Sequence, residues 1–221
     1  MSKLIEYDED AWRAYPQHRW VFNKLDLALK LGYSAGPCGV TVREPGHYIV
    51  RPIYNLSGMG VGARRVYLEE GDWETVKPGE FWVEQFHGRQ LSIDYAWDHN
   101  FPYTPRAIFA AQGYRTQPEL YRFNAWRRVQ PPHMQLPEWI KLFHDVPQFN
   151  IEFVGDHIIE IHLRPGVADF PEGSTEIIPV WEDSAEEQHQ FMKSRSEWKW
   201  QPSPEDADGH LHIAREGFYF R

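Results

Sequence analysis

At 221 residues the chain can bury a substantial core, either as one large domain or as two smaller lobes. Hydrophobic residues make up 42% of the sequence and charged residues 25%, which is ordinary globular usage and excludes general disorder. The formal net charge of −9 disfavours broad attachment to nucleic acid or to anionic lipid, although a local basic pocket could still bind a phosphorylated ligand.

Other features of the sequence point to a cytoplasmic protein. The single cysteine, Cys38, cannot form an internal disulfide, and the first residues lack the apolar core of a signal peptide. No apolar run approaches the roughly 20 residues of a membrane-spanning helix. The basic and aromatic segment YRFNAWRR is compatible with single-stranded nucleic acid, but the acidic balance of the chain disfavours nucleic acid as a partner.

The first elements expected along the chain are a helix and a hairpin. Leucines and a tryptophan recur at broadly helical spacing over residues 18–33, where Gly32 is a natural stop. The β-branched and aromatic residues of 47–56 predict a strand that carries Arg51. Residues 57–70 begin as a glycine-rich turn and return into a second strand, so the two segments together predict a hairpin.

More strands and a second helix are expected further along. Two apolar-aromatic runs, 81–86 and 91–97, predict strands with a turn between them at HGRQ. Apolar residues at helical spacing predict a helix over 136–146. Two strands follow at 150–155 and 157–165, joined by a Gly-Asp turn, and HLHIAREGFYF near the C-terminus predicts a last strand.

Glycines recur in the segment SGMGVGARR, at Gly58, Gly60 and Gly62, just ahead of Arg64 and Arg65. Glycine adopts positive φ and has no Cβ to obstruct a close approach, so the N–H groups of such a hairpin tip can lie against phosphate. Glycines that only form the turn are the commoner case, and this alternative stays open. The loop indicates a phosphate site only in company with other motifs.

Charged residues alternate along the last two strands before residue 166. Glu152 lies on the first, while Glu160, His162 and Arg164 share one face of the second because side chains alternate along a strand. That face could hold a cation, and the arginine could neutralise an anion or the charge of a transition state. A solvated sheet face is the simpler alternative.

From Trp20 to Pro165 the order of these motifs resembles that of the ATP-grasp superfamily. FNKLDLALKLG resembles the family's early helix with Lys24 in the basic position, and YIVRPI resembles its phosphate-contacting strand, with Arg51 in place of the more usual lysine. The resemblance implies one α+β domain over 1–221 with an ATP-grasp-like two-lobed fold, mainly antiparallel sheets and the nucleotide between the lobes. The smaller, nucleotide-covering lobe is expected over about 20–90, and the larger, metal-binding lobe over 91–221.

The resemblance also implies the residues of a Mg-ATP site. FWVEQFHG resembles the adenine-binding hinge of the family, and EIHLR resembles its E-x-N-x-R motif with histidine in place of asparagine. Histidine is a poorer ligand for Mg²⁺ than an oxygen donor, so Mn²⁺ is the alternative metal. The implied site has Arg164 as the catalytic residue, Lys24, Arg51, Ser57, Gly58, Met59, Gly60, Gly62, Arg64, Glu84, Gln85, Phe86 and His87 for the nucleotide, and Glu152, Glu160 and His162 for the metal.

The implied activity is that of an ATP-dependent carboxylate–amine or carboxylate–thiol ligase, which acts through an acyl-phosphate on an unidentified carboxylate. The alternative is a catalytically degenerate ATP-grasp-like protein that binds a nucleotide or has a structural role. His162 favours this alternative, as do the few residues ahead of Lys24, where the family usually carries a separate substrate domain. The sequence identifies neither the substrate nor the oligomeric state.

Overall fold

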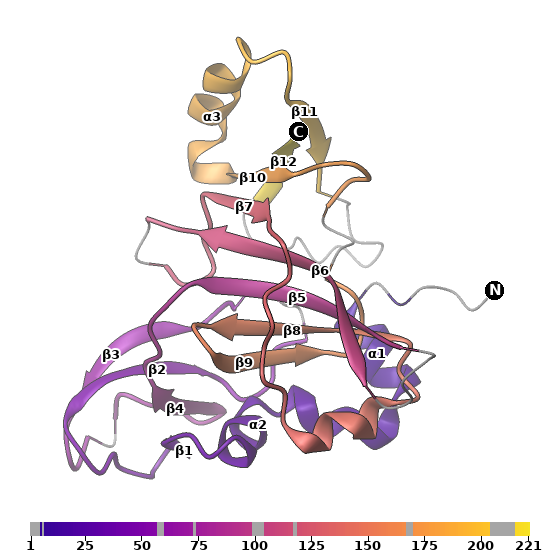
Figure 1. Cartoon of the computed structure of the whole chain (residues 1–221). Helices are drawn as coiled ribbons and strands as arrows, with labels where there is room; N and C mark the ends of the chain where they lie inside the picture. Colours follow the sequence, from indigo (N-terminus) through magenta and orange to yellow (C-terminus); the bar gives the residue numbers. More distant parts are fainter. Residues whose placement is uncertain are drawn as a thin grey trace.

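Two antiparallel β-sheets organise the chain (Figure 1). The computed structural model describes residue 5 and residues 7–56, 60–72, 74–98, 104–116, 119–166, 170–203 and 215–221. The smaller sheet has four strands in the order β1-β4-β2-β3. Its strands are β1 (Ala35–Pro37), β2 (Gly46–Pro52), β3 (Arg64–Leu68) and β4 (Glu80–Glu84).

The larger sheet has eight strands in the order β11-β12-β10-β7-β6-β5-β8-β9. They are β5 (Gln90–Trp97), β6 (Pro105–Tyr114), β7 (Ala125–Arg128), β8 (Gln148–Val154), β9 (His157–His162), β10 (Glu176–Trp181), β11 (Lys199–Pro202) and β12 (Arg215–Phe220). The expected last strand corresponds to β12, while the first part of its motif, residues 210–214, lies outside the described residues. The α+β class with mainly antiparallel sheets is confirmed.

Short helices flank the sheets. They are α1 (Asp8–Ala14), the 3-10 helix η1 (Pro16–Phe22), α2 (Lys24–Lys30), the 3-10 helices η2 (Glu138–Phe143) and η4 (Glu182–Ser184), and α3 (Ala185–Met192). None of the helices in the described part of the chain has the length and apolar character needed to cross a membrane. In Figure 1, α2 lies beside the small sheet and α3 lies at the far end of the large one.

The helix expected over 18–33 is two helices, because Asn23 interrupts it. The Asn23 side chain accepts a hydrogen bond from the Asp26 backbone N–H at 3.1 Å, so Asn23 caps the start of α2 instead of continuing η1. Gly32 has a φ of +79° just after α2, as expected for a helix stop. The cap matters for the site because it makes Lys24 the first residue of α2.

Most of the core lies where β5, β8 and β9 meet the N-terminal helices. Phe143, Phe149 and Ile151 are fully buried there, packed with Leu27 of α2 and Val21 of η1. A second cluster joins α2 to the small sheet through Ala28, Phe81 and Val83. Burial of this apolar surface is the main favourable term of folding, and it holds α2 between the two sheets.

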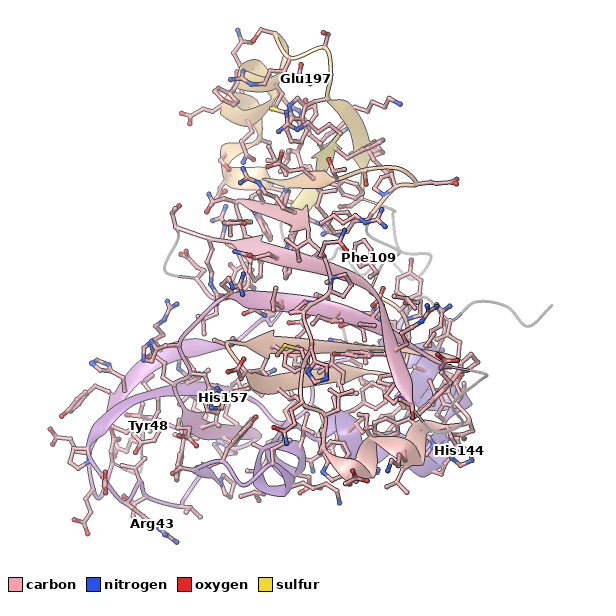
Figure 2. All side chains as sticks on the ribbon, viewed as in Figure 1. Arg43, Tyr48, Phe109, His144, His157 and Glu197 are labelled. Atoms are coloured by element: carbon pink, nitrogen blue, oxygen red, sulfur yellow. The ribbon has the colours of Figure 1, made fainter. Side chains whose placement is uncertain are left out.

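The segment between β4 and β5 passes from one sheet to the other. The sequence predicts a turn at 87–90, but β4 and β5 do not pair, and the segment instead crosses the β8–β9 turn. Gly155 donates its backbone N–H to the Arg89 carbonyl at 3.0 Å, and Gly88 has a φ of +133° at this crossing. Figure 2 shows His157, the first residue of β9, close to this junction of the two sheets.

Candidate functional site

A cavity of about 1310 Å³ lies between the two sheets and carries an excess of positive charge. Among the described residues, seven lysines and arginines line it against four aspartates and glutamates, although the whole chain has a formal charge of −9. These residues are Lys24, Arg51, Arg65, Arg89, Arg115, Arg164 and Arg215, against Asp8, Glu84, Glu152 and Glu160. The local reversal of charge favours an anionic ligand.

Glu160 of β9 forms the centre of the charged floor. Its Oε1 accepts a hydrogen bond from Lys24 Nζ at 2.8 Å and another from the Arg51 guanidinium, and all three residues are buried. Arg51 also donates to the Ile159 carbonyl at 3.3 Å. The two cations come from α2 and β2, beside and within the small sheet, whereas the carboxylate belongs to the large one, so the ion pairs join the two halves of the site.

The charges in this cluster set one another's protonation. Burial by itself would raise the pKa of Glu160, but Lys24 and Arg51 outweigh burial and hold that pKa well below its usual range. Burial also lowers the pKa of Lys24, an effect that Glu160 opposes. The ionised carboxylate is therefore the neutralising partner of two buried cations.

His162, two residues further along β9, is held by Asp8 at the start of α1. His162 Nδ1 lies 2.7 Å from one oxygen of Asp8, and Arg164 Nε donates to the other at 2.9 Å. Burial alone would lower the pKa of His162, but Asp8 and then Glu152 outweigh it and raise the pKa to about 10. The ring is therefore an imidazolium at neutral pH. Asp8, which no sequence motif selects, is a member of the site.

Glu152, Glu160 and His162 do lie together, as the sequence predicts. The two glutamates are register partners on β8 and β9, and His162 Nε2 lies 3.7 Å from Glu152 and 3.5 Å from Glu160. An imidazolium has no free lone pair to offer a metal, and Glu160 already holds two cations. Among the described residues no group of three or more acidic, histidine or cysteine side chains is placed to hold a metal ion.

The hairpin between β2 and β3 is as expected, and its tip is partly described. Gly60 and Gly62 have φ values of +64° and +80°, and Gly60 lines the cavity. Ser57, Gly58 and Met59 lie outside the described residues.

Arg64 is a correction to the expected site. Its guanidinium forms a bidentate pair with Glu80 at 2.6 and 2.8 Å and does not line the cavity. Successive side chains of a strand point to opposite faces, so the cavity position belongs to its neighbour Arg65.

Glu84, Gln85, Phe86 and His87 all line the cavity where the chain crosses between the sheets. Glu84 accepts the Ser34 backbone N–H at 2.8 Å, which ties the end of β4 to the segment after α2. Phe86 stacks on His157 with ring centroids 4.2 Å apart and an interplanar angle of 8°. The crossing therefore contributes four consecutive residues to the cavity lining, among them the Phe86 ring.

Solved structures with a similar fold include two N5-carboxyaminoimidazole synthetases. The enzyme from Staphylococcus aureus matches 90% of this chain and 66% of its own chain at 9% identity, with a TM-score of 0.55. The enzyme from Aspergillus clavatus, in complex with ADP and 5-aminoimidazole ribonucleotide, matches 99% of this chain and 74% of its own at 10% identity, with a TM-score of 0.50.

The chain has an ATP-grasp-like fold. A protein from Archaeoglobus fulgidus assigned to the ATP-grasp superfamily matches 73% of this chain at 14% identity, with a TM-score of 0.40. The chain spans 58% of the length of that protein. No protein-family model matches the sequence, and the comparison with curated proteins gives no match.

The ATP-grasp-like fold brings together most of the residues that the sequence predicts for the site. Lys24, Arg51, Gly60 and Arg164 line one cavity with the crossing segment 84–87 and the two glutamates of β8 and β9. The fold also pairs these charged residues with partners from distant parts of the chain: Lys24 and Arg51 with Glu160, and His162 with Asp8.

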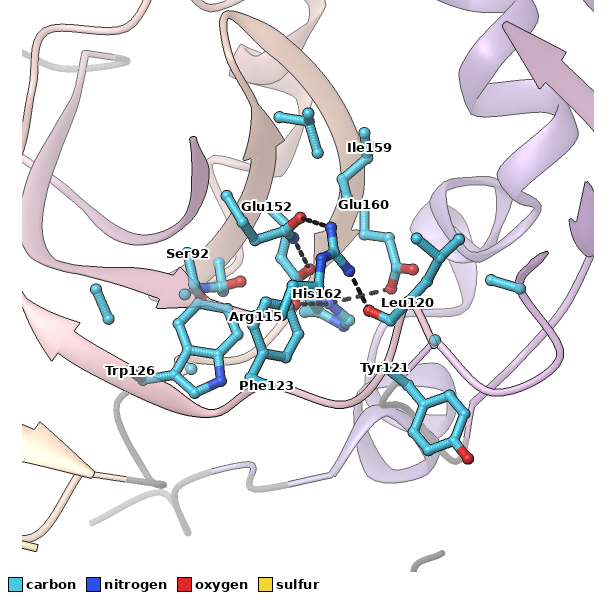
Figure 3. Close-up of a pocket in the computed structure, with 18 of the residues that line it drawn as sticks. Ser92, Arg115, Leu120, Tyr121, Phe123, Trp126, Glu152, Ile159, Glu160 and His162 are labelled. Atoms are coloured by element: carbon cyan, nitrogen blue, oxygen red, sulfur yellow. Dashed lines mark hydrogen bonds and ion pairs between the residues drawn. The ribbon is translucent and has the colours of Figure 1, made fainter. Parts of the chain in front are cut away.

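Arg115, just after β6, is a site residue that the sequence reasoning missed, because it predicted no strand there. The guanidinium donates to the Leu120 carbonyl and lies over the Phe123 ring, 5.0 Å from its centroid. Figure 3 shows it in the cavity between Glu152 and Leu120, next to Phe123. Burial and then Arg65 lower the pKa of Arg115 from its ordinary value, while Glu152 opposes them. The sequence signal that could have indicated Arg115 is the segment GYR at residues 113–115, where an arginine follows a glycine and an aromatic residue.

Proposed function

We propose that the cavity binds ATP and that the protein is an ATP-dependent carboxylate–amine or carboxylate–thiol ligase. One observation carries the proposal: Lys24 and Arg51, from beside and within the small sheet, converge on Glu160 of the large sheet inside a cationic cavity. Two buried cations aimed into a shared space are the feature that a polyphosphate requires. The ATP-grasp-like fold, found also in the ADP-bound synthetase, supports ATP as the anion.

In this proposal the adenine lies at the crossing between the sheets. The backbone of residues 84–87 would read the base edge, and Phe86 would offer a ring beside it. The phosphates would then reach Lys24, Arg51 and the hairpin tip at Gly60. For these cations to bind phosphate, the phosphate oxygens must take over the hydrogen bonds that Lys24 and Arg51 donate to Glu160.

The proposed chemistry is phosphorylation of a carboxylate followed by displacement of phosphate. A carboxylate oxygen attacks the γ-phosphorus, the bond to the β–γ bridging oxygen breaks, and ADP leaves with that electron pair. An amine or thiol then attacks the acyl carbon, loses its proton, and inorganic phosphate leaves. Arg164 would neutralise negative charge that develops during transfer. Asp8 holds its Nε, and the Pro165 carbonyl accepts a hydrogen bond from its Nη1 at 3.2 Å.

Magnesium or manganese, which the sequence predicts, receives no role in these steps. Glu152, Glu160 and His162 form an ion-paired network that does not fit a divalent cation, because an imidazolium occupies the space between the carboxylates. We infer that the cations of the protein itself neutralise most of the phosphate charge. This inference can be tested by measuring whether ATP binding requires a divalent metal ion.

A catalytically degenerate protein that binds ATP without turnover is the second candidate. The same network favours it, because a histidine cation stands where the family carries a neutral asparagine. The two candidates agree on nucleotide binding and differ only in the phosphoryl transfer.

Two measurements on the purified protein test the proposal. ATP should raise the melting temperature, because a ligand that binds only the folded state adds stability by mass action. ADP release should depend on an added carboxylate, with hydroxylamine present to trap the acyl-phosphate. Stabilisation without ADP release would establish the degenerate candidate, and no stabilisation at millimolar ATP would refute the nucleotide site altogether.

A further inference from the structure

The cavity extends past Arg115 into a part walled by aromatic rings, which we call the aromatic chamber (Tyr121, Phe123, Trp126 and Trp181). All four residues line the same cavity as Lys24 and Glu160. The Phe123 and Trp126 rings have centroids 4.3 Å apart, and those of Tyr121 and Trp181 are 5.9 Å apart. Figure 3 shows Phe123 and Trp126 side by side next to Arg115.

The sequence of β6 leaves room for these rings. A Cβ built on Gly113 would lie 2.5 Å from Phe123, which is closer than Cβ atoms approach in proteins, and 3.1 Å from Trp126, which is a tight contact. Gly113 is the register partner of Trp126 on β7, so glycine leaves room for the two rings, which pack on each other at an interplanar angle of 42°. The paired rings are therefore a built surface of the cavity wall.

Arg115 supplies a charge at the entrance of the chamber. Its guanidinium stacks on Phe123 and lies between the aromatic rings and the charged floor of the cavity (Figure 3). Nη1 of Arg115 donates to the Leu120 carbonyl and Nη2 to Gln90 Oε1 at 3.4 Å. Each of these nitrogens carries a second N–H, and a carboxylate matches the planar geometry of the guanidinium. Aromatic rings on the wall favour a ligand with a flat ring, since aromatic pairs are stabilised beyond the area that they bury.

We propose that the aromatic chamber is the acceptor subsite, and that the carboxylate substrate is an aromatic acid. Its ring would lie against Phe123 and Trp126, and its carboxylate would point past Arg115 toward the space between Lys24 and Arg51. The inference rests on the proposed function, because the carboxylate must meet a γ-phosphate there. It adds the class of the substrate, which neither the sequence motifs nor the fold supplies.

Binding of simple acids tests the subsite directly. Benzoate and cyclohexanecarboxylate carry the same charge and similar bulk, but only benzoate is flat. With ADP present, benzoate should bind at least tenfold more tightly than cyclohexanecarboxylate in isothermal titration, and it should stimulate ADP release from ATP more strongly. Equal affinities, or no binding of either acid, would overturn the subsite.

Variants of the wall give the second test. Trp126→Leu should lose the preference for benzoate while keeping ATP affinity within about threefold, because Trp126 lies beyond the charged floor. Trp200→Leu is the matched control, since Trp200 of β11 does not line the cavity. A Trp126→Leu protein that keeps the full preference would contradict the proposal.

A third variant serves if Trp126→Leu fails to fold. Arg115→Gln should weaken benzoate at least tenfold and leave benzamide, which has no charge, unchanged. An equal loss for both ligands would refute the role of Arg115 in binding the carboxylate. Benzoate binding without any ATP binding would overturn the proposed function but keep the chamber as a binding site, so the two failures are distinguishable.

Discussion

Arg51 and Glu160 lie 109 residues apart in the sequence and form a buried ion pair that joins the small sheet to the large one. Lys24 reaches the same carboxylate oxygen, so one acid holds two cations at the centre of the cavity. The pair has two consequences. It links the two sheets across the cavity, and it competes with any phosphate that would use the same cations.

The first prediction concerns Arg51. Arg51→Ala should weaken ATP binding tenfold to a hundredfold, because a hydrogen bond to a charged group contributes about 1.5–3 kcal/mol. Arg51→Lys should lose less, since it keeps the charge without the fork of donors. Isothermal titration with ATP measures both. Arg64→Ala is the control, because Arg64 pairs with Glu80 away from the cavity. If Arg64→Ala lost as much ATP affinity as Arg51→Ala, Arg51 would not be a residue of the ATP site.

The second prediction concerns Glu160. Glu160→Gln should lower the free energy of unfolding by about 3 kcal/mol, because it leaves two buried cations without their carboxylate. In EDTA its ATP affinity should stay equal to that of the wild type or increase, since Lys24 and Arg51 are released to phosphate. Glu152→Gln, on the neighbouring strand and more exposed, should cost less stability. A wild type that needs Mg²⁺ and a Glu160→Gln protein that no longer responds to it would instead make Glu160 a metal ligand.

The third prediction is a pH dependence of stability caused by His162. Its pKa is about 10 in the fold against 6.5 for an ordinary histidine, so its stabilising charge is fully present below about pH 6.5 and is lost as pH rises toward 10. Compared with His162→Asn, the wild type should lose stability over that window with a slope approaching about 1.4 kcal/mol per pH unit.

Urea unfolding at pH 6, 7, 8 and 9 measures that difference. His47→Asn, at an exposed position of β2, is the control and should follow the wild type. Parallel curves for the wild type and His162→Asn would show that Asp8 does not hold a charged imidazolium.

The fourth prediction concerns the crossing between the sheets. A Cβ on Gly88 would lie 2.6 Å from Gly155 Cα, whereas Gly79, which also has positive φ, has nothing within 4 Å of a built Cβ. Gly79→Ala should therefore cost only the backbone strain, about 1–2 kcal/mol. Gly88→Ala should cost a further 1–3 kcal/mol, because backbone must move apart at the crossing. Equal losses in urea unfolding would mean that the crossing is loosely packed.

Local pattern accounts for the parts of the site that the sequence predicts. Alternation along β9 is a period of two residues, so it places Glu160 and His162 on one face without knowledge of the rest of the chain. Glu152 lies opposite Glu160 because the register of β8 and β9 shifts between Glu152 and Phe153, which the alternation does not predict. The strand that carries Arg51 and the glycine turn after it follow from β-propensity and turn chemistry. The motif order of an ATP-grasp-like fold could be recognised from these local elements alone.

Only the tertiary structure decided which charges meet. His162 and Asp8 are 154 residues apart, and Lys24 and Glu160 are 136 apart, so no periodicity links them. These contacts decide the chemistry, because burial beside a carboxylate turns a candidate metal ligand into a cation. The sequence by itself determined the face and order of the functional residues, whereas burial and long-range pairing, which depend on the packed chain, determined their charge states and their partners.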